Sequence, residues 1–296
     1  MTELAESLLR GLGTGSVYAL LALGFVIIYK ATRVISFAQP AFMLAGAVLV
    51  TYLAGPVGFW AAVPVAAVLT AGLALGVERV AVRPMVGRPA FVVAIITLGV
   101  DVAVRVVVNG FIGLDVRHVG DPWGLRTVTI PGTGIDLQQR HLAALLATAV
   151  LIVGLFAFFR YTRMGLAMRA AAYDQEAALA QGVSVGGVFA LSWGLAGGLA
   201  AVAGTFAAAG ASVDAALWLI ALTALPVIIL GGLDSLPGAV VGGLAVGTIQ
   251  ELTASYQQHA PWLGGNVSVI SPYVLMLLVL LVRPYGLFGT REVERV

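Results

Sequence analysis

The polar stretch RYTRMGLAMRAAAYDQEAALAQGVSV, residues Arg160–Val185, separates two long apolar segments of the chain. Within it, Asp174 has the side chain of a helix N-cap, and Glu176 lies in the first turn, where an acidic group suits the helix dipole. Gly182 can take the left-handed conformation that ends a helix. These residues predict a capped helix of about two turns, which is too short to be stable alone in water. We therefore expect this helix to dock against another surface.

The composition around this stretch is that of a membrane protein. Sixty per cent of the 296 residues are hydrophobic and 10% are charged, whereas a soluble domain is about 25% charged. The mean hydropathy is +1.02. We expect a polytopic integral membrane protein with a single transmembrane domain, residues 1–296. The net charge of +2, the absence of cysteine and the three histidines indicate neither a nucleic-acid partner nor a metal centre.

The apolar residues fall into nine segments, which predict eight to ten membrane crossings. A crossing helix needs about 20 apolar residues, with about 17 as the lower limit. The segments that start at residues 37, 215 and 268 are close to that limit, so we expect some of them to be tilted, broken or re-entrant. The nine segments are 7–29, 37–54, 57–79, 90–111, 141–160, 187–210, 215–231, 239–256 and 268–283.

The basic residues predict an orientation with the N-terminus outside and the C-terminus inside. In that orientation the cytoplasmic loops hold eleven basic residues and the external loops hold four, which follows the positive-inside rule. Residues 160–187 are then a cytoplasmic region, and its short helix faces a soluble partner. The eleven are Lys30, Arg33, Arg79, Arg83, Arg88, Arg160, Arg163, Arg169, Arg283, Arg291 and Arg295, and the four are Arg10, Arg117, Arg126 and Arg140.

Two further features mark loops and breaks. Residues 112–140 form the one long external loop, and RTVTIPGTGIDL within it predicts a β-hairpin. Helix breakers gather at Ser36–Pro40 and at Gly231–Gly238, each before a segment rich in small residues. Broken helices at such related positions predict internal pseudo-symmetry and a transport pathway. The alternative is that these residues mark ordinary loops between helices.

Motifs for catalysis are lacking from the sequence. It contains no GxxxxGK[ST] and no HExxH. We therefore expect no enzymatic activity and no cofactor in this chain. If ATP drives the protein, another chain hydrolyses it.

Four stretches resemble one family of membrane proteins. Glu176-Ala177-Ala178 followed after three residues by Gly182 is similar to the coupling motif of bacterial ABC importer permeases. The wider TRMGLAMRAAAYDQEAALAQGV resembles, more narrowly, the permease subunits of branched-chain amino-acid importers. GLGTGSVYALLALGFVIIY resembles the opening helix of that family, GGLDSLPGAVVGG its glycine-rich turn, and RPYGLFG its C-terminal signature. The matches keep the expected order over nearly the whole chain.

The resemblance implies an all-α, pseudo-symmetric bundle in the bacterial cytoplasmic membrane. It also implies four partners: a second, homologous permease, two cytoplasmic ATPase subunits and an external substrate-binding protein. The cargo would be branched-chain amino acids or a related small solute. The residues expected to couple to the ATPase are Asp174, Gln175, Glu176, Ala177, Ala178 and Gly182.

The candidate pathway residues differ from the family pattern. Ser36-Phe37-Ala38-Gln39-Pro40 stands where the family commonly has Asn-Phe-Ala-His-Gly, which leaves the solute open. Ser36, Gln39 and Thr97 offer neutral hydrogen bonds. Asp101 and Arg105 share a helix face inside an apolar segment, where a charge costs about 2.5–3.5 kcal/mol. They line a pathway, pair with a partner permease, or form a structural pair that faces the bundle. As a pathway site they would also suit the alternative function, a stand-alone secondary transporter or channel.

Overall fold

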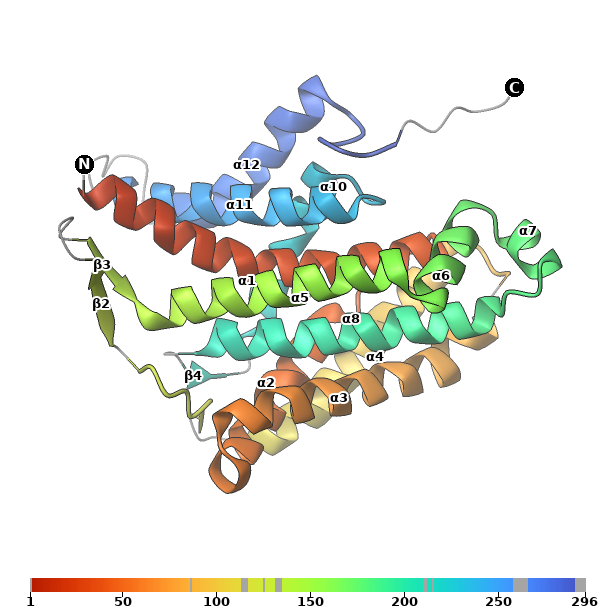
Figure 1. Cartoon of the computed structure of the whole chain (residues 1–296), viewed down its shortest axis with the longest axis horizontal. Helices are drawn as coiled ribbons and strands as arrows, with labels where there is room; N and C mark the ends of the chain where they lie inside the picture. Colours follow the sequence, from red (N-terminus) through yellow and green to blue (C-terminus); the bar gives the residue numbers. More distant parts are fainter. Residues whose placement is uncertain are drawn as a thin grey trace.

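The computed structural model describes residues 2–85, 87–112, 117–124, 126–130, 135–209, 212–214, 216–257 and 266–290. The described chain is mostly helical (Figure 1). Its helices are α1 Thr2–Thr32, α2 Gln39–Val57, α3 Phe59–Val77, α4 Ala90–Ile112, α5 Gln139–Tyr161, α6 Arg163–Tyr173, α7 Gln175–Ala180, α8 Val185–Ala208, α9 Trp218–Leu222, α10 Ala224–Gly231, α11 Leu236–Tyr256 and α12 Val267–Val282. A π-helical turn, Glu78–Val82, and a 3₁₀ turn, Arg83–Met85, extend α3.

Six helices in the described residues are long and apolar enough to cross a membrane. They are Glu3–Thr32, Gln39–Val57, Phe59–Met85, Ala90–Phe111, Gln139–Tyr161 and Val185–Ala208. Two shorter apolar helical segments, Trp218–Gly231 and Val267–Val282, fall below that length. The first of these is broken at Thr223 into α9 and α10, as its marginal length predicted. The chain is thus a multi-pass membrane protein, while nine crossings, their orientation and the pseudo-symmetry stay predictions.

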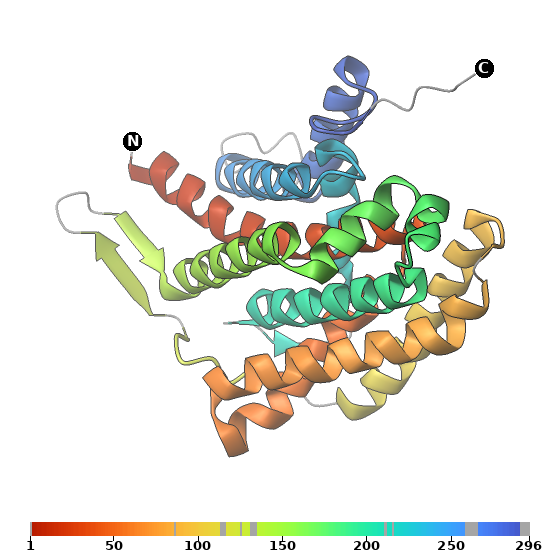
Figure 2. The same cartoon turned by 45° about the vertical axis from the view of Figure 1, so that its right-hand side comes forward.

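Helix α1 lies at the centre of the bundle, against α5, α8 and α11 (Figure 2). Small residues bring these backbones together. A Cβ atom added to Gly247 of α11 would lie 2.2 Å from the Cα atom of Gly15 in α1, and one added to Gly46 of α2 would lie 2.2 Å from the Cα atom of Ala201 in α8. Lipid supplies little hydrophobic drive between helices, so such close packing is what holds a bundle of this kind together.

The glycine-rich turn after α10 packs against the C-terminal segment. The backbone N–H groups of Leu287 and Phe288 donate to the carbonyl oxygens of Leu230 and Gly231, at 2.8 and 3.1 Å. Gly232 has a φ of +104°, and a Cβ atom there would lie 2.4 Å from the backbone N of Gly289. Two stretches that carried the family resemblance are therefore in direct contact, although they are far apart in the sequence.

The described strands form two short antiparallel pairs. Strand β2, Thr127–Ile130, pairs with β3, Ile135–Gln138, where the sequence has its two β-prone runs. The turn predicted between them, Pro131–Gly134, lies outside the described residues. Strand β1, Arg117–His118, pairs with β4, Ser212–Val213, and so ties the loop after α4 to the end of α8.

Candidate functional site

Helix α7 has the caps that the sequence predicts at both ends. Asp174 Oδ1 accepts a hydrogen bond of 3.0 Å from the backbone N–H of Ala177. At the other end, Gly182 has a φ of +80°. The N–H of Gly182 donates to Leu179 and the N–H of Val183 donates to Ala178, at 2.9 and 3.0 Å. This pair of bonds is the Schellman arrangement, which satisfies the last carbonyl groups of a helix.

The surface of α7 presents apolar side chains away from the bundle. Ala178 is buried, whereas Glu176 and Ala177 are exposed. Leu179 is 56% exposed, and Tyr173, just before the helix, is 94% exposed. Leu166 of α6 is also exposed. A short helix that shows a carboxylate among apolar side chains has the chemistry of a docking surface for another protein.

Two hydrogen bonds tie this region to the end of α1. The side-chain amide of Gln175 donates to the carbonyl oxygen of Ala31 at 2.9 Å. The guanidinium of Arg33 donates to the carbonyl oxygen of Ala172 at 3.1 Å. Arg33 is also the described non-glycine residue with a positive φ, 57°. A displacement of α6 and α7 would therefore act directly on the sharp bend between α1 and α2.

That bend leads to a helix start buried inside the bundle, where α4 supplies hydrogen-bond acceptors. Helix α2 begins at Gln39, and Ser36, Ala38 and Gln39 are fully buried. Thr97 Oγ1 of α4 accepts from the backbone N–H of Phe37 at 3.0 Å, and Ser36 Oγ accepts from the N–H of Ala38 at 3.3 Å. Unpaired N–H groups at a buried helix start would be costly, so these two hydroxyl groups stabilise the break.

Asp101 and Arg105 form an ion pair one turn further along α4. Arg105 Nη2 lies 2.6 Å from Asp101 Oδ2, and the two side chains are 20% and 6% exposed. The other carboxylate oxygen, Asp101 Oδ1, is buried and has no hydrogen-bond partner. Arg105 also stacks on Trp218 of α9, 4.0 Å from the ring centroid. The pair thus joins α4 to α9.

Gln39 is the predicted pathway residue that the structure leaves without a partner. Its side chain is fully buried, and neither Oε1 nor Nε2 makes a hydrogen bond. It fills the space over Gly24 of α1, where a Cβ atom would lie 2.1 Å from Nε2. A buried amide with free donors and an acceptor is able to receive a polar solute or water. The five pathway candidates therefore lie at the start of α2 and on the adjacent α4. They differ in whether their polar atoms already have hydrogen-bond partners.

Sequence reasoning missed a second buried ion pair. The sequence places Arg83 among the basic residues of the cytoplasmic loops and indicates no partner for Glu78. In the structure, Glu78 is 1% exposed and both of its carboxylate oxygens accept from Arg83, at 3.1 and 3.2 Å. Arg83 also donates to the carbonyl oxygen of Gly186 at the start of α8, at 2.9 Å. The π-helical turn brings residues five apart together, a spacing that the α-helical period does not suggest.

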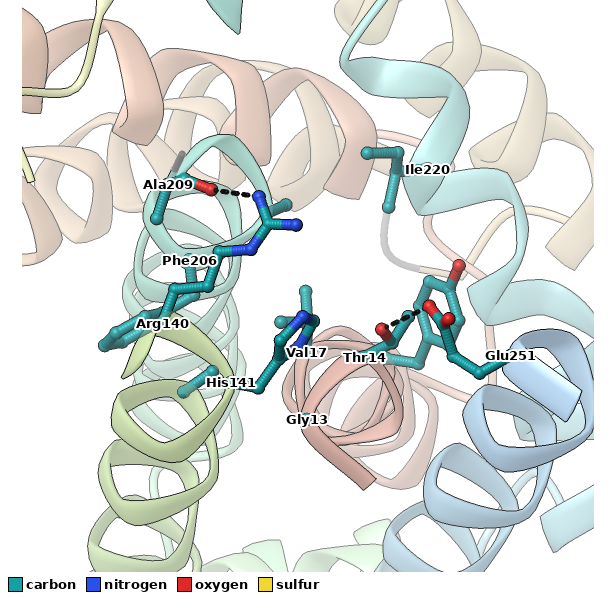
Figure 3. Close-up of a pocket in the computed structure, with 12 residues that line it drawn as sticks. Gly13, Thr14, Val17, Arg140, His141, Phe206, Ala209, Ile220 and Glu251 are labelled. Atoms are coloured by element: carbon teal, nitrogen blue, oxygen red, sulfur yellow. Dashed lines mark hydrogen bonds between the residues drawn. The ribbon is translucent and has the colours of Figure 1, made fainter. Parts of the chain in front are cut away.

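A charged pocket at the other end of the bundle was also missed (Figure 3). Its walls come from α1, α5, α8, α9 and α11, so no local stretch of sequence carries its signal. Arg140 lies on one side and Glu251 on the opposite side, and Glu251 accepts a hydrogen bond of 2.9 Å from Thr14. The one signal in the sequence is that Arg140 and Glu251 are charged residues near the ends of apolar segments.

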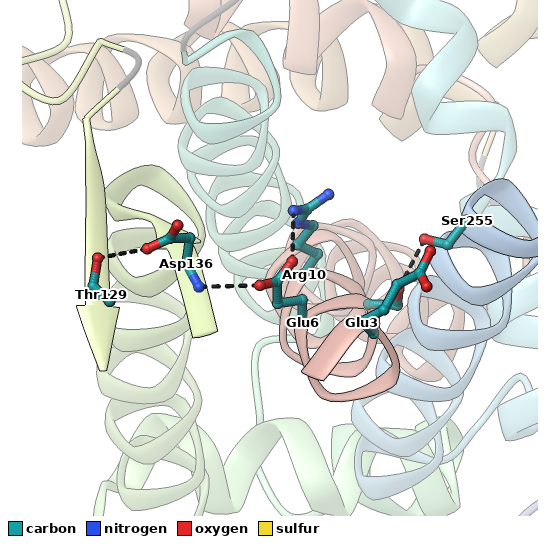
Figure 4. Close-up of polar contacts among 7 residues, drawn as sticks. Glu3, Glu6, Arg10, Thr129, Asp136 and Ser255 are labelled. Atoms are coloured by element: carbon teal, nitrogen blue, oxygen red, sulfur yellow. Dashed lines mark hydrogen bonds and ion pairs between the residues drawn. The ribbon is translucent and has the colours of Figure 1, made fainter. Parts of the chain in front are cut away.

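Beside this pocket, polar contacts hold the β2–β3 strands against the start of α1 (Figure 4). Glu6 accepts from the backbone N–H of Asp136 at 3.2 Å and pairs with Arg10 at 3.3 Å. Thr129 donates to the Asp136 carboxylate at 2.5 Å. The strands therefore form a fixed rim at the bundle end that is opposite to α7.

The long apolar helices and the polar short helix at one end define the class: a multi-pass membrane protein. A family model described as the permease component of the branched-chain amino acid transport system matches residues 7–280. The chain therefore belongs to this permease family, as the four resembling stretches predicted.

Similar proteins agree with this assignment, and one solved structure shares the fold. The high-affinity branched-chain amino acid transport system permease proteins LivH of Salmonella typhimurium and BraD of Pseudomonas aeruginosa are each 28% identical, over 98% of this chain and 97% of theirs. A probable branched-chain amino acid transport permease protein LivH of Methanocaldococcus jannaschii is 28% identical, over 91% of this chain and 88% of that protein. The solved PsaBC of Streptococcus pneumoniae, in complex with Fab, shares the fold, with a TM-score of 0.50 at 13% identity, over 93% of this chain and 91% of that chain.

Proposed function

We propose that this chain is the permease subunit through which an ATP-driven importer moves branched-chain amino acids, or a related small solute, across the bacterial cytoplasmic membrane. The observation that carries the proposal is the double-capped helix α7, displayed on a chain of this permease family. ATP is hydrolysed on other subunits, and this chain has no catalytic role. The alternative, a stand-alone transporter working through Asp101 and Arg105, is disfavoured because these two side chains neutralise each other.

Helix α7 is the surface on which a cytoplasmic ATPase subunit docks in this proposal. Glu176, Ala177 and Leu179 would enter a groove of the ATPase, while Asp174 and Gly182 keep the helix formed. The complete importer would contain two ATPase subunits, this chain with a second homologous permease, and an external substrate-binding protein. Residues 160–187 then act as the cytoplasmic coupling region and residues 112–140 as the external loop.

Force from the ATPase would reach the pathway through the bend between α1 and α2. A ligand or partner shifts a conformational equilibrium only by binding its two states with different affinity. The bonds from Gln175 to Ala31 and from Arg33 to Ala172 support this route, because they join the docking region to the chain just before the buried start of α2. Closure of the ATPases would thus move the break between α1 and α2.

The five pathway candidates take different parts in this scheme. Ser36 and Thr97 accept hydrogen bonds from the helix break, and Arg105 pairs with one carboxylate oxygen of Asp101, so we assign these four residues a positioning role. Gln39 keeps its amide free and is the residue that we expect to touch the solute. Its access to the solute would require the break to open.

Reconstituted uptake tests the proposal directly. The permease, its ATPases and the binding protein are placed in proteoliposomes, and radiolabelled leucine uptake is measured with and without ATP. We expect uptake that needs both ATP and the ATPase subunits, and that falls strongly in the Glu176→Lys variant, while the exposed control Arg126→Gln is unaffected. Uptake by this chain alone on an ion gradient would overturn the proposal and favour the stand-alone transporter.

A further inference from the structure

The charged pocket has room for a small solute. Its cavity encloses about 170 Å³, far more than the ~10–15 Å³ that a single water needs. Arg140 lies on one wall, and Glu251 with the Thr14 hydroxyl lies on the opposite wall. Val17, Phe206 and Ile220 also line the pocket. The pocket lies near the start of α5 and the end of α8. It is about 27 Å along α1 from the bend that contacts α7, at 1.5 Å per residue from Gly13 to Ala31.

The two charges face the cavity from opposite sides and do not pair with each other among the described residues. Arg140 Nη1 donates to the carbonyl oxygen of Ala209 at 3.1 Å, and its Nε atom is buried with no partner. Glu251 accepts from Thr14 at 2.9 Å. Tyr18 and His141 also line the cavity. Both charges are thus anchored by one hydrogen bond each and keep capacity for a ligand.

We propose that this pocket is a binding site for the head group of a zwitterionic α-amino acid, on its way into the permease. Arg140 would bind the α-carboxylate, and Glu251 would bind the α-ammonium group. The apolar wall of Val17, Phe206 and Ile220 would receive a branched aliphatic side chain. The proposal rests on the function proposed above and names the substrate class that this site selects.

The arrangement of charge selects a zwitterion over molecules with a single charge. An acid without an ammonium group leaves Glu251 unpaired, and an amide without a carboxylate leaves Arg140 unpaired. Leaving a partly buried charge without its partner costs more than a neutral hydrogen bond contributes. Two opposite charges at one site therefore favour a zwitterion in two ways: they attract its two charged groups, and they weaken the binding of a solute that leaves one of them unpaired.

Competition binding tests this site on the complete importer in nanodiscs, without the binding protein. Tritiated leucine is displaced by leucine, by leucinamide, which lacks the carboxylate, and by 4-methylpentanoate, which lacks the ammonium group. We expect leucine to bind about tenfold or more tighter than either derivative. Arg140→Gln should weaken leucine binding by a similar factor and strengthen leucinamide binding, because it removes the charge that leucinamide leaves unpaired. Glu251→Gln should weaken leucine binding and strengthen 4-methylpentanoate binding, because it removes the charge that this acid leaves unpaired.

The comparison within one variant guards against misfolding, because a loss of folded protein lowers the total amount of leucine bound and leaves the ratios of the three affinities unchanged. The matched controls, Arg126→Gln and Glu3→Gln, remove exposed charges outside the pocket and should change nothing. Equal losses for the three solutes, or unchanged leucine binding in both pocket variants, would overturn the site. The same preparations are assayed for ATP-driven uptake with the binding protein. Uptake that persists while the site fails leaves the permease function standing, and absent wild-type uptake refutes that function separately.

Discussion

The ion pair between Asp101 and Arg105 yields a prediction whose size follows from its geometry. With Nη2 and Oδ2 2.6 Å apart and side chains 20% and 6% exposed, breaking the pair leaves one charge in a poorly solvated place. Such a loss costs about 3–5 kcal/mol. We expect Arg105→Gln to approach that value, because Arg105 is the hydrogen-bond partner of Asp101 Oδ2 and Oδ1 already has none. Asp101→Asn should cost less, since Arg105 is the more exposed partner and retains its stack on Trp218.

The double variant tests whether the two residues stabilise the protein as a direct pair. Asp101→Asn with Arg105→Gln removes both charges and replaces them with side chains that can still hydrogen-bond. Its destabilisation should therefore be at least about 2 kcal/mol smaller than the sum of the two single effects, which is a coupling expected only of direct partners. Unfolding free energies measured in mixed micelles supply the values, and Arg126→Gln serves as an exposed control. The double variant should also retain leucine uptake within about twofold.

Additive single effects would show that the two residues do not act as a pair. Loss of uptake in a double variant of normal stability would show that the charges take part in transport, and would contradict the positioning role assigned to them.

Three further predictions concern the caps and the turns. Gly182→Ala places a Cβ atom at a φ of +80°, which costs about 1–2 kcal/mol. Amide exchange in residues 177–183 should therefore accelerate, and uptake should fall. The control Gly72→Ala, whose Cβ atom meets no atom within 4 Å, should leave uptake unchanged. Thr97→Ala should cost about 1–3 kcal/mol by orphaning the N–H of Phe37, and Thr97→Ser should restore most of it. Gly232→Ala should lower the thermal midpoint by displacing the segment at Gly289, as measured by fluorescence-detected size exclusion.

Each of these predictions has an outcome that contradicts it. Unchanged exchange in α7 after Gly182→Ala would mean that the left-handed cap is dispensable. Equal stabilities of the Ala and Ser variants at Thr97 would remove the hydroxyl from the account of the helix break. A thermal midpoint unaffected by Gly232→Ala would mean that the contact between the glycine-rich turn and the C-terminal segment contributes nothing to stability.

Local features of this protein were predictable from its sequence. The caps of α7 at Asp174 and Gly182 depend on the side chain and backbone preferences of single residues, and the structure has both. The contact of Asp101 with Arg105 follows from a spacing of four residues in a helix. The weakness of the segment before Gly231 was visible in its length, and it is broken into α9 and α10.

Features that depend on long-range packing were not predictable. The pocket joins Thr14 to Arg140 and Glu251, which only the packing of α1 between α5 and α11 brings together. The buried pair of Glu78 and Arg83 needs a π-helical turn, which side-chain periodicity does not announce. The number of crossings is also a global property, because marginal segments such as 268–283 are decided by their neighbours.

The central claim is that α7 is the contact between this chain and an ATPase. The chain has no cysteine, so Ala180→Cys on exposed α7 and Thr127→Cys on the strand rim each provide a single reactive site. Cross-linking in the assembled importer is the most direct measurement. We predict that the cysteine at 180 forms a cross-link to the ATPase subunit whose yield changes with ATP, and that the cysteine at 127 forms none. A cross-link from position 127, or its absence from position 180 in a complex that transports, would contradict the account.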